Sequence, residues 1–217
     1  MSIVVDFRDV VAVAGSFPVL TGVDVRIDAG ELVLLSGANG AGKTSLLRAC
    51  AGLQPVSAGS AEVLGYDLRV DRRAPRRYIG LLGHENCLYR DLRVREHIEF
   101  RASVAGLKIS DASDSLARVG LDDRLWSAPV AALSAGQRRK LAIASIIVSR
   151  PRLWLLDEPH AALDSEGRLT MNSIMEEVAS LGATVVFASH DKELSEQLAS
   201  RVITMSNGRL TEDSGAS

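Results

Sequence analysis

A glycine-rich stretch with a single lysine carries the clearest chemical signal in the chain. Residues 37–44 read Gly-Ala-Asn-Gly-Ala-Gly-Lys-Thr, the pattern G-x-x-x-x-G-K-T. Glycines let such a loop wrap so that backbone N–H groups point inward at phosphate oxygens, and a following helix adds its positive N-terminal end. We predict that Lys43 reaches the β- and γ-phosphates of a nucleotide and that Thr44 ligates Mg²⁺. The predicted nucleotide-binding residues here are Gly37, Ala38, Asn39, Gly40, Ala41, Gly42, Lys43, Thr44 and Ser45.

Two acids at the end of an apolar run form the second candidate. The run Arg-Leu-Trp-Leu-Leu at 152–156 is followed by Asp157 and Glu158. A strand that ends in this way places its carboxylates at the edge of the sheet where α/β proteins bind ligands. Asp157 suits the holding of Mg²⁺ and its water shell, and Glu158 suits the base that orients or deprotonates an attacking water. Many strands end in an acid, so the signal depends on the phosphate loop upstream.

A serine–glycine turn is the third candidate. Residues 133–137 read Leu-Ser-Ala-Gly-Gln and precede a helical stretch at 138–149. Ser134, Gly136 and Gln137 could form a second anion site, because a hydroxyl, free N–H groups and the helix dipole meet at a helix N-terminus. The alternative is an ordinary helix cap, since serine is among the preferred N-cap residues.

The three motifs and two further segments together resemble the ABC ATPase family in order and spacing. The further segments are Pro-His-Ala-Ala-Leu-Asp at 159–164 and Ala-Ser-His-Asp at 188–191. The resemblance covers nearly the whole chain, and the turn at 133–137 is the signature peculiar to that family among P-loop proteins. It implies two ATP molecules sandwiched between two copies, so that Ser134, Gly136 and Gln137 contact the γ-phosphate held by the other copy. It places Asp164 near the dimer seam.

Three further residues take roles from the resemblance. His190 matches the switch histidine that contacts the γ-phosphate and positions Glu158 and the water, although a lone histidine at a strand end is often an incidental surface residue. His84 stands where the family usually carries a glutamine that relays the nucleotide state, and its alternative is an incidental loop residue. The aromatic residue that stacks on adenine is missing from its usual place at Ala14-Gly15. Phe17 is the candidate substitute, and the alternative is that it belongs to the core.

The elements that must position these residues alternate between strands and helices. Apolar runs at 31–36, 152–156, 183–188 and 201–206 predict strands, and the last one meets a hairpin signal at Asn207-Gly208. Helical patterns fill the segment from roughly 85 to 150. With the resemblance, this predicts an α/β fold: a RecA-like P-loop ATPase core with an antiparallel β subdomain and an inserted helical subdomain. We expect one domain over 1–211 and a disordered tail at 212–217.

Composition limits the partners. The chain has 217 residues, is 47% hydrophobic and 24% charged, and has a net charge of −2. The absence of a basic excess gives no support to nucleic-acid binding, and no basic cluster beside an amphipathic helix indicates a direct lipid anchor. No apolar run reaches the roughly 18 residues of a membrane span, and nothing at the N-terminus directs export. Cys50 and Cys87 make no disulfide framework, so we expect a reduced, cytoplasmic protein.

The expected function is the ATP-binding and ATP-hydrolysing subunit of an ABC transporter. Its expected partners are an integral-membrane permease and a second copy of itself or a homologous ATPase subunit, and its expected place is the cytoplasmic face of the membrane. Local detail resembles the haem-exporter ATPases of cytochrome c maturation (CcmA-type): Leu-Ser-Ala-Gly-Gln-Arg-Arg at 133–139, Trp-Leu-Leu-Asp-Glu-Pro at 154–159, and Gly83-His84. A haem site is not assigned at 84–87, because the attachment motif Cys-x-x-Cys-His is absent.

Other classes remain as alternatives. One is a soluble ABC ATPase that works without a transporter, and another is the ATPase of a different small-molecule or drug exporter. A P-loop kinase or GTPase is a third, and the signature turn and the switch histidine count against it. Both import and export are open.

Overall fold

The computed structural model describes residues 2–189 and 197–215 and contains two sheets. The larger sheet has six strands in the order β10-β9-β3-β8-β7-β6, and every neighbouring pair except β10–β9 is parallel. Its strands are β3 (Leu32–Ser36), β6 (Ile79–Leu82), β7 (Leu153–Asp157), β8 (Thr184–Ala188), β9 (Arg201–Ser206) and β10 (Arg209–Asp213). Parallel strands need crossover connections, and helices supply those from β6 to β7 and from β7 to β8.

The continuous apolar runs of β3, β7 and β8 are explained by burial on both faces of the sheet. Val33 and Leu35 of β3 face one core with helix α1 (Lys43–Cys50), whereas Leu32 and Leu34 face a second core with helix α6 (Ser165–Ser180). Alternate residues of one strand therefore serve opposite cores, as the pleat of a strand requires. Because both faces are buried, the position of each strand in the sheet is fixed. The residues that follow the carboxyl end of each strand are therefore fixed in position as well.

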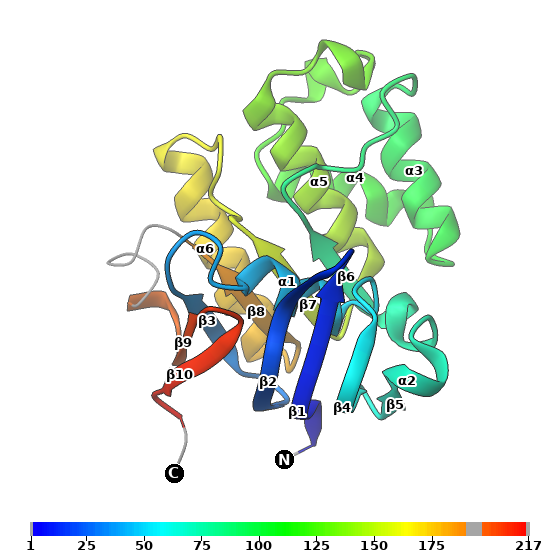
Figure 1. Ribbon diagram of the computed structural model, residues 1–217. Helices are drawn as coiled ribbons and strands as arrows, with labels where there is room; N and C mark the ends of the chain where they lie inside the picture. Colours follow the sequence, from blue (N-terminus) through cyan, green and yellow to red (C-terminus); the bar gives the residue numbers. More distant parts are fainter. Residues whose placement is uncertain (1, 190–196, 216–217) are drawn as a thin grey trace.

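A second, antiparallel sheet lies over α1 on the first core. Its order is β2-β1-β4-β5, formed by β1 (Ile3–Ala14), β2 (Phe17–Asp28), β4 (Val56–Val63) and β5 (Tyr66–Asp67). A short helix, α2 (Leu68–Asp71), follows β5. Figure 1 shows this sheet in front of α1, which is held between the two sheets.

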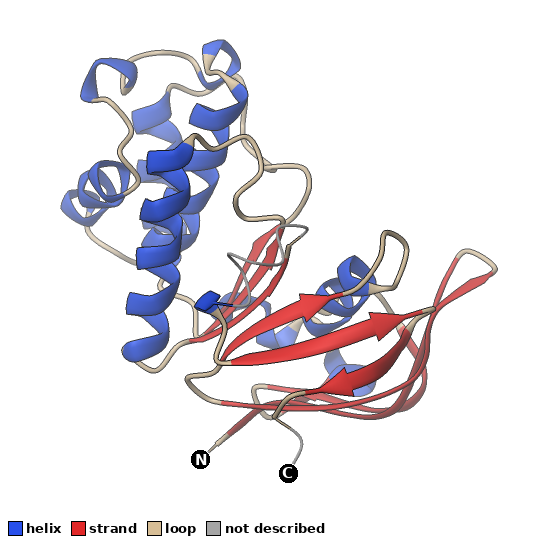
Figure 2. Cartoon of the chain, turned by 90° about the vertical axis from the view of Figure 1, so that its left-hand side faces the viewer, coloured by secondary structure: helices blue, strands red, loops and turns tan. Residues whose placement is uncertain are grey.

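Three helices lie between β6 and β7 along the chain and share the second core with the larger sheet. They are α3 (Val94–Val104), α4 (Ile109–Arg118) and α5 (Ala135–Ser149), and they pack against one another around Ile98, Leu116 and Leu141. Figure 2 shows these helices gathered on one side of the molecule, beside the strands. Short 3-10 helices lie at Ala74–Tyr78, Asp123–Leu125 and Val130–Ala132. Within the described residues, no helix combines the length and the apolar character needed to cross a membrane.

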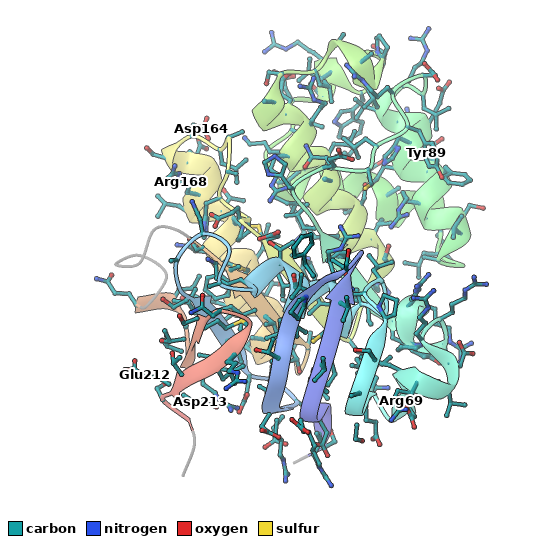
Figure 3. The ribbon with its side chains drawn as sticks, viewed as in Figure 1. Arg69, Tyr89, Asp164, Arg168, Glu212 and Asp213 are labelled. Atoms are coloured by element: carbon teal, nitrogen blue, oxygen red, sulfur yellow. The ribbon has the colours of Figure 1, made fainter. Side chains whose placement is uncertain are left out.

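The end of the chain differs from the expectation. A disordered tail at 212–217 is wrong for Glu212 and Asp213, because β10 extends to Asp213 and pairs there with β9. Arg201 explains the extension: its guanidinium donates to both carboxylate oxygens of Asp213, at 2.8 and 2.6 Å, and also to Glu31 at 2.9 Å. The hydrogen bonds from Arg201 lower the pKa of Asp213 below its ordinary value. Figure 3 labels Glu212 and Asp213 at this edge of the larger sheet.

Candidate functional site

The phosphate loop connects β3 to the N-terminus of α1, as its pattern predicted. Gly37 and Gly42 have φ angles of 135° and 110°, which disfavour other residues. A Cβ on Gly37 would also lie 2.3 Å from the carbonyl oxygen of Met205, so only glycine fits. The buried Lys43 donates from Nζ to the carbonyl oxygens of Gly37 at 2.7 Å and of Ala38 at 3.0 Å. One ammonium group and the positive end of a helix therefore lie inside one loop.

The β9–β10 turn supports this loop from outside. The backbone N–H of Gly208 donates to the carbonyl of Ala41 at 2.9 Å, and the N–H of Thr21 donates to the carbonyl of Gly208 at 2.9 Å. A Cβ on Gly208 would lie 2.8 Å from the carbonyl oxygen of Val19. The Asn-Gly signal predicted a hairpin, but it gave no sign that the hairpin turn contacts the phosphate loop.

The acid at the end of β7 meets the loop. The hydroxyl of Thr44 donates to the Asp157 carboxylate at 2.7 Å, although 113 residues separate them. Magnesium prefers octahedral oxygen ligands about 2.1 Å away, so adjacent ligands lie about 3 Å from one another. The Thr44 and Asp157 oxygens are thus close enough to be neighbouring ligands of one Mg²⁺. The residues present fit the ion that the sequence predicted.

An open cavity of about 720 Å³ joins these groups. It brings together most of the residues that the sequence predicted for the nucleotide, from the loop to the end of β7. Phe17 is not among the lining residues, although its neighbour Pro18 is; its side chain is 76% exposed, so it is not a core residue. The lining comprises Pro18, Val19, Thr21, Asn39, Gly40, Ala41, Gly42, Lys43, Thr44, Ser45, His84, Asp157, Glu158, Asn207 and Gly208.

Glu158 follows β7 in an unusual backbone conformation. Its φ is 50°, a left-handed value that few residues other than glycine, asparagine and aspartate adopt. Its N–H donates to the carbonyl of Ala188 at 2.9 Å, which ties it to the end of β8. Strained backbone of this kind gathers at functional sites. The predicted switch residue His190 lies outside the described residues.

Arg139 is a residue of this site that the sequence reasoning missed. It lies on α5, is only 3% exposed, and donates to the carbonyl oxygens of Asp157 and Glu158, both at 2.6 Å. It also donates to Gly83 and Asn86, on either side of His84. No signal in the sequence singles Arg139 out, because it is the middle one of three consecutive basic residues at 138–140.

The signature turn lies at a second cavity of about 320 Å³ rather than at the first. Ser134 caps α5: its hydroxyl accepts from the N–H of Gln137 at 3.2 Å, and the Gln137 side chain accepts from the N–H of Ser134 at 2.8 Å. A Cβ on Gly136 would lie 2.6 Å from the carbonyl oxygen of Ala162, so close packing requires glycine here. The helix-capping alternative is therefore real, and the anion-binding role stays a prediction.

Asp164 lies at the same second cavity. It is the N-cap of α6, where its carboxylate accepts from the N–H of Gly167 at 2.8 Å. Figure 3 labels Asp164 at the N-terminal end of α6. Ser134, Gly136, Gln137 and Asp164 all line this cavity, and none of them lines the cavity at the phosphate loop. The chain thus presents two separate groups of predicted site residues.

The comparisons with known proteins agree with this geometry. Residues 20–161 match the family model described as "ABC transporter". A cytochrome c biogenesis ATP-binding export protein, CcmA, of Nitrobacter winogradskyi is 40% identical over 82% of this chain and 87% of its own length. The glutamine transport ATP-binding protein GlnQ of Escherichia coli is 34% identical over 96% of this chain and 90% of its own length.

A solved structure shares the fold. It is a dimeric, post-hydrolysis state of an ATP-binding cassette bound to ADP and phosphate, and it covers 96% of this chain and 97% of its own. The TM-score is 0.87 at 23% identity. The predicted fold class is thereby confirmed.

Proposed function

The chain belongs to the ABC transporter family and is an ATPase, and from this membership we propose that it hydrolyses Mg-ATP at the phosphate loop to drive a membrane transporter. The observation that carries the proposal is the hydrogen bond between Thr44 and Asp157 beside the ammonium of Lys43. Two segments far apart in the sequence therefore supply two oxygen atoms that could ligate Mg²⁺. Beside them lies an ammonium group that could bind phosphate. That combination is what a nucleoside triphosphate with its metal requires.

Each residue has a distinct task in this proposal. Bound ATP with Mg²⁺ supplies the phosphoanhydride bond that water breaks. Lys43 exchanges its present carbonyl acceptors for the β- and γ-phosphate oxygens, and Thr44 and Asp157 hold the metal. Glu158 orients the attacking water and accepts its proton as the bond to phosphorus forms and ADP leaves. His84, which lines the same cavity, would contact the water or the metal.

Lys43→Ala tests the phosphate loop. We expect ATP affinity to fall about 10- to 100-fold, because hydrogen bonds to charged groups are worth about 1.5–3 kcal/mol. Isothermal titration calorimetry with Mg-ATP measures this directly. Lys108→Ala, which removes an exposed lysine at the start of α4, is the control and should bind normally. Wild-type affinity in Lys43→Ala would remove the phosphate-binding assignment.

The second proposed element is a partner copy that completes each site. The signature cavity, with Ser134, Gly136, Gln137 and Asp164, lies apart from the phosphate loop of its own chain. The solved cassette that shares this fold is dimeric. In the proposed dimer, Ser134, Gly136 and Gln137 of one copy contact the γ-phosphate held by the other, with Asp164 near the seam. Each ATP would then contact the phosphate-loop cavity of one copy and the signature cavity of the other.

The third proposed element is an integral-membrane permease that docks on the helical insert, near residues 84–95. This places the chain on the cytoplasmic face of the membrane. Tyr89 and Phe100 support the proposal, because they are 55% and 45% exposed and their rings meet edge to face at 5.5 Å. Figure 3 shows Tyr89 at the outer side of α3. A groove of about 450 Å³ runs nearby, with Arg76, Arg77 and Arg101 along it. Its charge suits a permease segment that carries carboxylates.

Arg90→Glu tests this docking surface. Arg90 is exposed and its side chain makes no hydrogen bond or ion pair within the described structure, so the substitution should leave the fold intact. We expect the ATPase activity of the isolated chain to persist while transport by the complex is uncoupled. Arg8→Glu, which changes a comparably exposed arginine on the antiparallel sheet, is the control. Unchanged coupling in Arg90→Glu would place the docking surface elsewhere.

Haem, exported for cytochrome c maturation, is the cargo that the chain's local sequence supports best. The CcmA relative named above is a cytochrome c biogenesis export protein. The glutamine transport relative covers more of the chain, so amino-acid transport is the second candidate. Co-purification of the chain with its permease, followed by ATPase assays with haem or with glutamine, separates them. Haem stimulation supports export, glutamine stimulation supports the second candidate, and purification without any membrane protein supports a soluble ABC ATPase.

A further inference from the structure

The guanidinium of Arg139 joins three parts of the site in a way that no motif describes. One terminal nitrogen donates to the carbonyls of Asp157 and Glu158, both at 2.6 Å. The other donates to the carbonyl of Gly83 at 2.8 Å and to the side-chain oxygen of Asn86 at 3.0 Å. We propose that Arg139 is a positioning residue that holds Glu158 and His84 in the arrangement needed for hydrolysis. The inference rests on the proposed function of Glu158 as the base.

The chemistry of the contact suits arginine and no other side chain. Its four acceptors lie around one planar fork, and guanidinium presents its donors in such a fixed plane. A lysine would offer a single point of charge in place of two separate nitrogen atoms. Burial lowers the pKa of Arg139 to about 10, while the charges of Asp157 and Glu158 act in the opposite direction, so the side chain stays charged at neutral pH.

Stability alone does not explain a charge at this position. Arg139 is 3% exposed, and its Nε is a buried donor without a hydrogen-bond partner among the described residues. Desolvating a charge costs several kcal/mol, and well-packed apolar residues are often as stabilising as a buried charge with its partners. A buried arginine that leaves one donor unsatisfied therefore indicates a functional reason for its retention.

The geometry of Glu158 supplies that reason. Its φ of 50° is a strained conformation, which costs roughly 1–3 kcal/mol and persists only when the surroundings hold it. On one side, the N–H of Glu158 is tied to Ala188 at 2.9 Å. On the other side, its carbonyl is tied to Arg139 at 2.6 Å. These two anchors fix the direction in which the Glu158 side chain leaves the backbone.

The same guanidinium sets the position of His84. Gly83 and Asn86 bracket His84 in the loop after β6, and both accept from Arg139. His84 and Glu158 line the nucleotide cavity and also a smaller cavity of about 200 Å³ that Arg139 itself lines. Arg139 thus holds the backbone of the two segments that carry His84 and Glu158, and both of these residues line the nucleotide cavity. Arg139 lies two residues after Gln137 on α5, so it also connects these two segments to the helix that begins at the signature turn.

Arg139→Gln and Arg139→Lys test the proposal in steady-state kinetics and in Mg-ATP binding. We expect kcat to fall at least about tenfold in both variants, with KM and Kd for Mg-ATP within about twofold of wild type. Asn86→Ala, which removes one of the four acceptors, should give a smaller fall in kcat. Arg118→Gln is the control, since that arginine of α4 pairs with Glu177 and lines neither of the two cavities. Equal losses of binding and of kcat, or a wild-type kcat in Arg139→Gln, would overturn the proposal.

A combined variant separates this inference from the function on which it rests. If Arg139 acts through Glu158, then Arg139→Gln should reduce the residual rate of Glu158→Gln no further. An additional tenfold loss in the double variant would contradict the positioning role. If Glu158→Gln itself keeps the wild-type rate, the assignment of the base fails. If Glu158→Gln is inactive while Arg139→Gln is fully active, only the role of Arg139 fails. Should Arg139→Gln prove unfolded by circular dichroism, Arg139→Lys and Asn86→Ala decide the matter.

Discussion

At the scale of single residues, Glu158 is the position where a change of one atom has the sharpest consequence. Glu158→Gln keeps the shape and hydrogen bonding of the side chain but cannot take up a proton. We expect ATP binding to persist and turnover to fall at least about 100-fold, with a stable dimer in Mg-ATP on gel filtration. Glu166→Gln, an exposed change in the first turn of α6, should hydrolyse normally. A wild-type rate in Glu158→Gln would show that another group is the base.

The sequence predicted the residues whose chemistry depends on a local pattern. Lys43, Thr44 and Asp157 belong to short motifs with a fixed mechanism, and the structure brings their side chains together. Arg139 could not be predicted in the same way, because its partners are mainly backbone carbonyls of distant loops, and carbonyls leave no mark in a sequence. Phe17 shows a different limit. Its exposure excludes a place in the core, but exposure depends on tertiary packing, which no local sequence pattern reports.

At the scale of elements, α3 and α5 meet through a buried histidine that makes the helical insert sensitive to acid. His97 is 1% exposed; its Nε2 lies 3.2 Å from the hydroxyl of Ser145, and its Nδ1 has no hydrogen-bond partner within the described structure. Burial, with a smaller contribution from Arg101, lowers the pKa of His97 from 6.5 to about 4. Protonation therefore favours the unfolded chain at pH values between these two.

The expected result is a loss of stability as the pH falls. The contribution of His97 is fully present above about pH 6.5 and decreases towards pH 4, amounting to about 2 kcal/mol between pH 7 and pH 5. Thermal melts at the two pH values measure it. His97→Phe should reduce the difference between them. An unchanged difference in His97→Phe would assign the effect to other groups.

The predictability of elements followed the periodicity of their apolar residues. The strands β3, β7 and β8 were predictable because burial on both faces leaves continuous apolar runs. The end of β10 was not, because Glu212 and Asp213 look like a solvated tail until Arg201 is placed beside them. Ion pairs between neighbouring strands depend on register, and a polar tail carries no register signal of its own.

At the scale of the whole molecule, a mixture of two inactive variants tests whether each site combines two chains. Lys43→Ala damages the phosphate loop, and Ser134→Arg fills the signature turn. In a mixed dimer, one composite site carries both lesions and the other carries none, so some ATPase activity should return on mixing. If both elements served the same chain's nucleotide, every site would keep a lesion and activity would stay absent.

A silent mixture needs a second measurement, since an enzyme that requires two intact sites would also remain inactive. Gel filtration of the mixture with Mg-ATP supplies it. A mixed dimer is expected, and its complete absence would contradict the composite site. The sequence predicted this arrangement only through the family resemblance, because a contact between two copies leaves no pattern along one chain.

The strand order also has a consequence for how the protein is made. The strand β8 lies between β3 and β7, so Thr44 and Asp157 cannot adopt their present spacing until residues 184–188 have left the ribosome. The phosphate loop is synthesised long before that point. For most of translation it therefore lacks its contact with Asp157. A ligand stabilises only a chain that can bind it. We therefore expect ATP to protect the completed protein from proteolysis, and to give no protection to nascent fragments that end before β8.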